Sequence, residues 1–191
     1  MPTARPQSLP ATGADDALDV MLARRSVRRY AAADITPGEE RQLIDAAFAA
    51  PSGNNSRPWH FVFVRDPEIR AALKAMHEWT WMLDRSPLVV AVLARAEASP
   101  WWIEDGAAAI ENMLNMATAL GIGSVWCGMR DEATEEEGCE ARCLAVLEAP
   151  DDYRVLALVG FGHPARPKKP RTQVQPTKLS FERFGRHGRE A

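Results

Sequence analysis

The chain has 191 residues, of which 46 % are hydrophobic and 26 % charged, values that suit a single globular domain with a sizeable core. Its net charge of −3 argues against nucleic acid or an anionic membrane as a bulk partner, and no apolar run reaches the roughly 20 residues of a membrane-spanning helix. The three cysteines are an odd number without a disulfide pattern, so we expect a protein of the reducing cytoplasm.

Helix and strand signals are mixed along the whole chain, which indicates an α+β or α/β class. Residues 1–14 have no apolar stretch like that of a signal peptide, and we expect a disordered lead-in before one domain over residues 15–191. The first half predicts a helix over 15–25, a helix over 37–50, a strand over 60–65, a helix opened by Asp66 and a strand over 88–93. The second half predicts a helix over 104–120, a strand over 124–127, an acidic surface over 131–137, a helix over 140–147 and a strand over 154–160.

The helix expected over residues 37–50 has the most complete start signal. Thr36 can cap it, Pro37 fits its first position, and Glu39 completes a capping box. Pro51 ends this helix and opens the stretch PSGNNSRPWHFVFV, which places small polar residues directly before a strand. Two explanations of the polar stretch remain open, a turn and a ligand-binding loop.

Two basic clusters stand far apart in the sequence. Residues 24–30, RRSVRRY, hold four arginines after the first helix, and Lys168, Lys169 and Arg171 belong to an extended, proline-rich basic tail over about residues 163–191. The arginines either stay solvated near a helix C-terminus or clamp a phosphate group bidentately. Two such clusters in an acidic protein fit convergence on one anion.

The sequence argues against several familiar kinds of site. Residues 121–126, GIGSVW, begin like a dinucleotide fingerprint, but they follow a helix and precede a strand, which is the reverse of the Rossmann order. No P-loop, zinc-protease or serine-hydrolase motif occurs. Cys139 and Cys143 lack a second pair of metal ligands, and Cys127 has no adjacent residue that would activate its thiol. We therefore expect neither a metal nor a catalytic side chain.

Four motifs, in their order along residues 15–175, resemble those of the nitroreductase family of FMN-dependent oxidoreductases. RRSVRRY resembles the family's opening Arg-x-Ser element, and APSGNNSRPWHFVFV resembles its Ala-Pro-Ser-x-x-Asn-x-Gln-Pro-Trp element. EDGAAAIENMLNMATALGIGSVWCGM resembles the long central helix and the glycine-rich turn beside the flavin. LVGFGHPARPKKPRTQ resembles the last core strand and the basic tail that returns to the flavin phosphate.

The resemblance implies a role for each residue that matches a family motif. A first set would contact the phosphate and the polar side of FMN: Arg24, Arg25, Ser26, Arg28, Lys169 and Arg171. A second set would reach the flavin from the partner subunit of a homodimer: Pro51, Ser52 and Asn55. The backbone at Cys127 and Gly128 would face the flavin N5 edge. Two features depart from the family pattern: Arg57 stands where the family commonly has Gln, and the family tends to have Gly near the position of Met129.

The resemblance also implies a fold and a reaction. The fold would be nitroreductase-like α+β, with a mixed, mainly antiparallel central sheet flanked by helices and an extended C-terminal tail, in a homodimer. FMN would accept hydride from NAD(P)H at N5 and pass electrons, in a ping-pong scheme, to a small acceptor such as a nitroaromatic, a quinone or an enone. The alternative is a non-catalytic protein of the same fold that stores FMN or senses redox state. Neither nucleic acid nor a membrane is expected as a partner.

Overall fold

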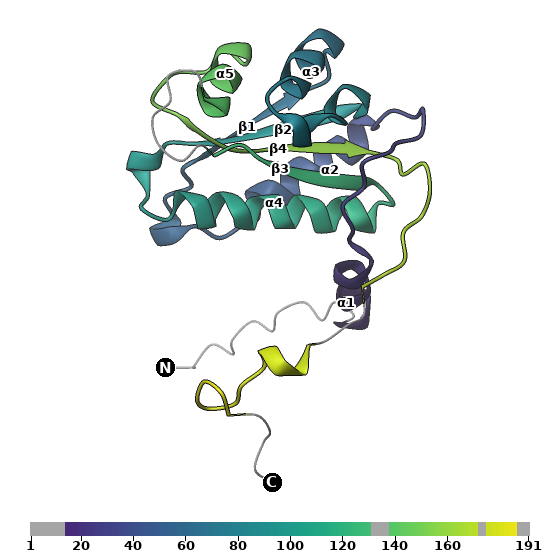
Figure 1. The fold of residues 1–191 in the computed structure, drawn as a ribbon, viewed down its shortest axis with the longest axis vertical. Coiled ribbons are helices and arrows are strands. Elements are labelled where there is room, and N and C mark those ends of the chain that lie inside the picture. The colour runs from purple at the N-terminus through teal and green to yellow at the C-terminus, as the bar shows by residue number, and fades with distance from the viewer. Residues whose placement is uncertain (1–13, 131–137, 172–174, 187–191) are drawn as a thin grey trace, which may run out of the picture.

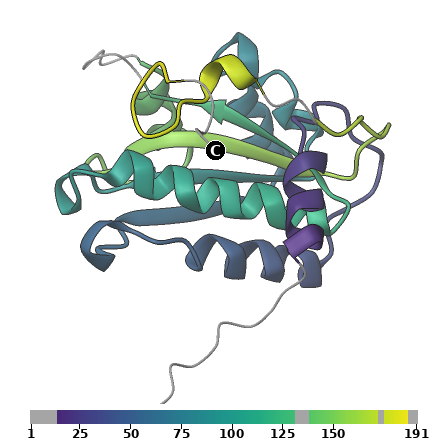
Figure 2. The ribbon, with the colours of Figure 1, turned by 90° about the horizontal axis from the view of Figure 1, so that it is seen from below.

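The computed structural model describes residues 14–130, 138–171 and 175–186, so residues 1–13 of the lead-in expected over 1–14 and the acidic surface at 131–137 lie outside the described residues. Four strands form one antiparallel sheet in the order β1-β2-β4-β3. They are β1 (Trp59–Val64), β2 (Leu88–Ala94), β3 (Gly123–Gly128) and β4 (Arg154–Gly162). Helices α3 (Pro67–Lys74) and α5 (Cys139–Val146) cover one face, and α2 (Pro37–Phe48) and α4 (Trp102–Ala119) cover the other (Figure 1). Helix α1 (Ala14–Ala23) lies against α4, across its axis (Figure 2).

Every helix and strand expected from the sequence is present, with ends that differ from the expected ones by at most two residues. The α+β class, with helices flanking a mainly antiparallel sheet, is therefore confirmed. Within the described residues, parallel pairing is limited to a bridge between Ser26 and Ser124. The sequence pattern did not predict the short 3-10 turns: η1 (Gly53–Asn55), η2 (Glu78–Thr80), η3 (Leu83–Arg85), η4 (Ala96–Ala98) and η5 (Pro176–Lys178).

Strand β2 is the centre of the core, as its unbroken apolar run predicts. All of its residues are buried, and alternate side chains point to opposite faces of the sheet. Val90 and Val92 pack in one cluster with Ile110 of α4, whereas Val89 packs in another with Leu73 of α3. The sheet is thus a central layer between two helical layers, and β1 and β3 are its two edges.

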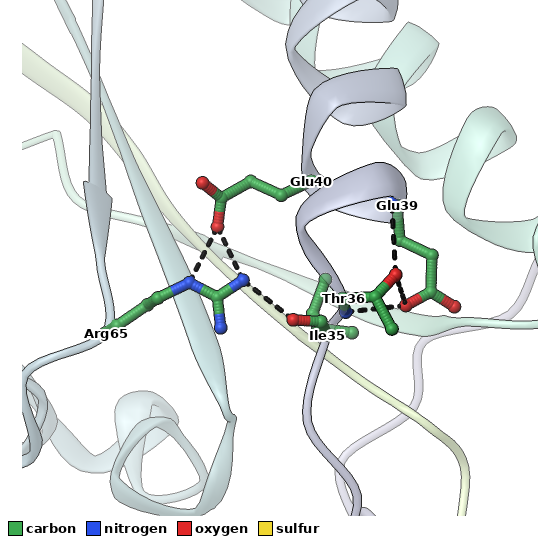
Figure 3. Close-up of polar contacts among 5 residues, drawn as sticks. All are labelled: Ile35, Thr36, Glu39, Glu40 and Arg65. Atoms are coloured by element: carbon green, nitrogen blue, oxygen red, sulfur yellow. Dashed lines mark hydrogen bonds and ion pairs between the residues drawn. The ribbon is translucent and has the colours of Figure 1, made fainter.

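The start of α2 is fixed by the capping box that the sequence predicts (Figure 3). The Glu39 N–H donates to Thr36 Oγ1 at 3.2 Å, and the Glu39 carboxylate accepts from the Thr36 N–H at 2.7 Å. The hydrogen bonds to this carboxylate favour its ionised form and lower the pKa of Glu39. Arg65, just after β1, donates to Glu40 at 2.7 Å and to the carbonyl of Ile35 at 2.8 Å, which ties α2 to the end of β1 (Figure 3).

The segment after α1, residues 24–31, pairs with the segment after β4, residues 163–171, and we call this arrangement the crossing. The two segments come from the purple and the yellow-green parts of the chain, which lie side by side beyond the ends of β3 and β4 (Figure 1). Backbone hydrogen bonds of 2.8 to 3.0 Å hold the crossing: Ala31 N–H to His163 O, Ala165 N–H to Arg29 O, and Arg171 N–H to Leu22 O.

Tyr30 fixes the crossing against the sheet. Its ring lies so close to Gly162 that an added Cβ there would come within 2.8 Å of the ring carbon Cδ1 and 2.7 Å of Pro87 Cδ. Its hydroxyl lies 2.9 Å from the Val27 carbonyl and 3.2 Å from the Gly160 carbonyl, so it can donate to either. Burial raises the pKa of Tyr30 well above its usual range. Position 162 therefore requires glycine because of this close approach.

We predict that Gly162→Ala lowers the free energy of unfolding by about 1–3 kcal/mol, because the added methyl group must displace the Tyr30 ring or Pro87. Urea unfolding of the two proteins measures the difference. Gly38→Ala is the control, since a Cβ at Gly38 meets nothing nearer than Thr36 Oγ1 at 4.0 Å, and alanine in the first turn of α2 should leave the stability unchanged or raise it. A Gly162→Ala midpoint no lower than that of the wild type would show that Tyr30 does not fix the crossing.

Candidate functional site

The crossing brings the two basic clusters of the sequence together. The Arg25 guanidinium donates to the Lys169 carbonyl, and the Lys168 ammonium donates to the Ser26 carbonyl at 2.7 Å. The Arg171 N–H donates to Leu22 at the end of α1, so Arg171 also lies at the crossing. Cations that are far apart in the sequence thus share one small region.

Arg24 lies beside this cationic region and forms an ion pair with α4. Its Nε is 3.6 Å from Glu111 Oε1, and the two side chains are 26 % and 51 % exposed. An ion pair with this exposure contributes little to stability, because water and salt screen it. The Arg24 guanidinium can therefore exchange Glu111 for an anionic ligand at small cost.

Strand β3 is an edge strand, so half of its backbone groups face away from the sheet. The Ser124 carbonyl faces outward, since it accepts from the Val27 N–H at 2.8 Å, and the Met129 N–H faces inward and donates to the Leu156 carbonyl of β4. Because these directions alternate along an antiparallel strand, the N–H groups of Trp126 and Gly128 also face the open edge.

A cavity of about 440 Å³ lies beside this part of β3. Three of its lining residues are residues that the sequence predicts for a cofactor: Arg28, Cys127 and Gly128. Trp79 and His77, from the turn after α3, form another part of its wall. An added Cβ at Gly128 would meet nothing within 4 Å, so the backbone here is open to a ligand at van der Waals distance.

A second cavity, of about 540 Å³, is lined by four cations, Arg28, Arg29, Arg166 and Lys168, and by the apolar residues Val27, Trp81, Ala165 and Pro167. Arg28 lines both cavities, which places them next to each other. Guanidinium groups bind phosphate oxygens bidentately, whereas an open strand edge offers N–H donors to the rim of a planar ring. The donor set therefore fits a ligand with a phosphate at one end and a planar polar ring at the other. Five of the predicted phosphate residues line neither cavity and lie at the crossing beside the second one: Arg24, Arg25, Ser26, Lys169 and Arg171.

The predicted cofactor residues Pro51, Ser52 and Asn55 lie elsewhere on the chain. Their loop leads into β1, the edge of the sheet opposite to β3, and none of the three lines either cavity. Within one chain the structure therefore does not bring them to Cys127 and Gly128.

The loop from Pro51 to Arg57 is nevertheless held in a defined shape. The Gly53 N–H donates to Asp105 at the start of α4 at 2.8 Å, and Asp105 is buried. Arg57 has a positive φ of 48°, its N–H donates to Ser52 Oγ at 3.0 Å, and its Nε donates to Asn55 Oδ1 at 3.0 Å. Arg57, the departure from the family pattern, thus orients the two polar side chains that the sequence assigns to a ligand.

Two of the three thiols are held in the protonated state. Burial raises the pKa of Cys127 to about 11 and that of Cys143 to about 12. The Cys127 thiol also lies 3.4 Å from the Trp79 carbonyl, to which it can donate. Neither thiol is a nucleophile at neutral pH, because the thiolate is the reactive form.

His77, Trp79 and Trp81 line the cavities and were not predicted as site residues. They lie in and around the 3-10 turn η2, which has no hydrophobic periodicity to reveal it. The tryptophans at 79 and 81 are the one signal in the sequence for this part of the site. The sequence does not show which of its six tryptophans faces a ligand.

The family model of the Nitroreductase family matches residues 21–83 and 74–163 of this chain. The chain belongs to the nitroreductase family. A relative from Archaeoglobus fulgidus, named as an NADH dehydrogenase/NAD(P)H nitroreductase, is 33 % identical over 154 residues, which cover 78 % of this chain and 86 % of the relative. The oxidoreductase class expected from the sequence is therefore confirmed.

Solved structures of the nitroreductase family have the same fold. An FMN-dependent nitroreductase from Clostridium difficile superposes with a TM-score of 0.83 at 26 % identity, over 87 % of this chain and 99 % of that chain. A protein from Desulfovibrio desulfuricans, described as a nitroreductase in complex with FMN, superposes with a TM-score of 0.74 at 26 % identity, over 88 % and 97 %. The nitroreductase-like fold is confirmed by these matches.

No helix in residues 14–130, 138–171 or 175–186 is long and apolar enough to cross a membrane. The same ranges contain no group of three His, Cys, Asp or Glu side chains that could hold a metal ion.

Proposed function

We propose that this nitroreductase is an FMN-dependent oxidoreductase that takes hydride from NAD(P)H and reduces a small organic acceptor. The observation that carries the proposal is the crossing, which gathers cations of both basic clusters beside the open edge of β3. The FMN named for the two structural relatives has a phosphate and a planar ring, which is the kind of ligand that this donor set fits.

The phosphate end of FMN belongs at the crossing in this proposal. The residues that would hold it are Arg24, Arg25, Ser26, Lys169 and Arg171. Arginine stays charged at any relevant pH and offers a planar fork of donors, so it holds a phosphate dianion in a fixed orientation. The hydrogen bonds that tie Arg25 to Lys169 and Lys168 to Ser26 hold both segments in place before the ligand arrives.

The ring end belongs beside β3. Bound FMN supplies the hydride chemistry at N5, which no side chain of this protein needs to perform. The outward N–H of Gly128 would donate to the ring at its N5 edge, and the Arg28 guanidinium, which lines the same cavity, would stabilise negative charge on the reduced ring. Trp79 and His77 form one wall of the cavity and would cover one side of the bound ring.

A homodimer completes the site in this proposal, with Pro51, Ser52 and Asn55 reaching the flavin of the partner subunit. Large apolar side chains are exposed next to this loop in the single chain, since Phe48 is 53 % and Trp101 is 47 % exposed. Exposed apolar groups that flank a rigid polar loop suit an interface with a second copy. The Arg57 that orients Asn55 would then be the residue of the partner that sets acceptor preference.

The acceptor is a nitroaromatic, a quinone or an enone, and the reaction follows a ping-pong scheme because donor and acceptor use the same open face. The place of the reaction is the cytoplasm. A non-catalytic FMN store or redox sensor would need the same phosphate site, so the two functions differ in turnover rather than in FMN binding.

Anaerobic stopped-flow mixing of the FMN-loaded protein with NADH or NADPH tests the reductase function. We expect the flavin absorbance near 450 nm to bleach on the order of seconds or faster, since enzymes commonly turn over about 1–1,000 times per second. Oxidation by a quinone should then restore the absorbance. Protein that stays yellow with both donors would contradict the reductase function and favour FMN storage.

We predict that Arg24→Ala and Arg171→Ala each weaken FMN binding about tenfold or more, because each removes a charge-assisted hydrogen bond to the phosphate. Fluorescence titration of apo-protein with FMN measures the dissociation constants. Arg41→Ala is the control, since Arg41 is 74 % exposed and pairs only with Asp45 on its own helix among the contacts of the described residues. Unchanged FMN affinity in both variants would refute the phosphate site.

A further inference from the structure

The imidazole of His77 joins the turn after α3 to the end of β3. Its Nδ1 accepts from the Trp79 N–H at 3.0 Å, and its Nε2 lies 3.0 Å from the Gly128 carbonyl. A ring nitrogen that accepts a hydrogen bond carries no proton, so the neutral ring has its proton on Nε2. The Nε2–H therefore donates to Gly128, and both nitrogens of the ring are used.

The turn that presents His77 is itself firmly held. Thr80 is buried, its Oγ1 accepts from the His77 N–H at 3.2 Å, and its hydroxyl can donate to the Lys74 carbonyl at 2.8 Å. The Cys127 thiol, 3.4 Å from the Trp79 carbonyl, makes a second connection between the turn and β3. The imidazole is thus anchored on one side before it contacts Gly128 on the other.

Gly128 is the part of β3 that most needs such a contact. It is the last residue of an edge strand, it is exposed, and it has no side chain to restrict its backbone. The contact from His77 fixes its carbonyl, and the Gly128 N–H on the same residue faces the same open edge. Trp79, which is 68 % exposed, is held next to it as a wall of the cavity.

We propose that His77 is a positioning residue that holds the Gly128 backbone and the Trp79 wall in the geometry that the ring of the bound cofactor requires. The inference rests on the proposed function, because it assumes that FMN lies beside β3. It assigns to His77 no contact with the reacting atoms. Its effect reaches the cofactor through the Gly128 N–H and through the position of Trp79.

Two substitutions separate the two hydrogen bonds of the imidazole. In His77→Asn the side-chain oxygen occupies the place of Nδ1 and still caps the Trp79 N–H, but nothing reaches the Gly128 carbonyl. In His77→Gln the terminal amide nitrogen lies as many bonds from Cβ as Nε2 does, so it can still donate to Gly128. His60→Asn is the control, because His60 lies at the β1 edge against Tyr153 and lines neither cavity of the site.

The experiment measures the FMN dissociation constant, the visible spectrum and the midpoint potential of bound FMN for the wild type and the three variants, with circular dichroism to check folding. We expect His77→Asn to weaken FMN binding about three- to tenfold, the loss of one hydrogen bond, and to shift the flavin spectrum and potential. His77→Gln should recover most of the wild-type values, and His60→Asn should match the wild type.

The results that would overturn the role of His77 differ from the result that would refute the proposed function. Folded His77→Asn with wild-type affinity, spectrum and potential would overturn it. A loss in His77→Gln as large as or larger than that in His77→Asn would also overturn it, because the cap on the Trp79 N–H, and not the Gly128 contact, would then carry the effect. Loss of folding in both variants would overturn it as well, because the imidazole would then be required for the fold and not for the cofactor. Wild-type protein that binds no FMN would instead refute the proposed function.

Discussion

The close packing of Tyr30 against Gly160 and Gly162 is the constraint on which the candidate site depends. The ring fits because Gly162 has no Cβ, and a Cβ at Gly160 would come within 3.3 Å of the Tyr30 hydroxyl oxygen. That hydroxyl can donate to a carbonyl of β4 or of its own segment. This packing holds residues 24–31 across the ends of β3 and β4, where they pair with residues 163–171. The cations on both segments repel one another, so the backbone hydrogen bonds and the buried ring must hold them together until an anion neutralises them.

The two edges of the sheet have different roles. Residues 24–31 cover the first part of the β3 edge through the bridge from Ser26 to Ser124, and the part from Trp126 to Gly128 stays open beside the cavity. The β1 edge carries the rigid loop with Arg57, flanked by exposed apolar side chains. In a family whose hydride chemistry belongs to a cofactor, the protein contributes fixed donors, fixed cations and a shaped cavity. The protonated thiols of Cys127 and Cys143 agree with this division of work.

The sequence predicts the fold well because its elements carry their own signals. Thr36 and Glu39 mark the start of α2, the apolar run of β2 marks a strand buried on both faces, and Gly121, with a φ of 73°, marks the end of α4. The two arginine- and lysine-rich segments also suggest a shared anion through their composition alone. These features depend on neighbours in the sequence, which is why periodicity and capping reveal them.

The remainder of the site depends on single long-range contacts. The contact between His77 and Gly128 joins residues 51 positions apart, and nothing in the turn around His77 points to β3. Arg28 lines both cavities, and nothing in its sequence neighbourhood distinguishes it from the three arginines beside it. The proposed placement of Pro51, Ser52 and Asn55 at the flavin involves a second chain, so neither the sequence pattern nor one subunit can test it. Specific long-range hydrogen bonds therefore determine the parts of the site geometry that local sequence patterns do not predict.

The most direct test of the central claim, that the crossing binds the phosphate of a flavin, compares FMN with riboflavin, which has the same ring and ribityl chain but no phosphate. Isothermal titration of apo-protein with each ligand gives the two dissociation constants. The account predicts that riboflavin binds about a hundredfold or more weakly than FMN, since at least two charge-assisted hydrogen bonds are lost. Riboflavin affinity within about twofold of the FMN affinity would contradict a phosphate site at the crossing.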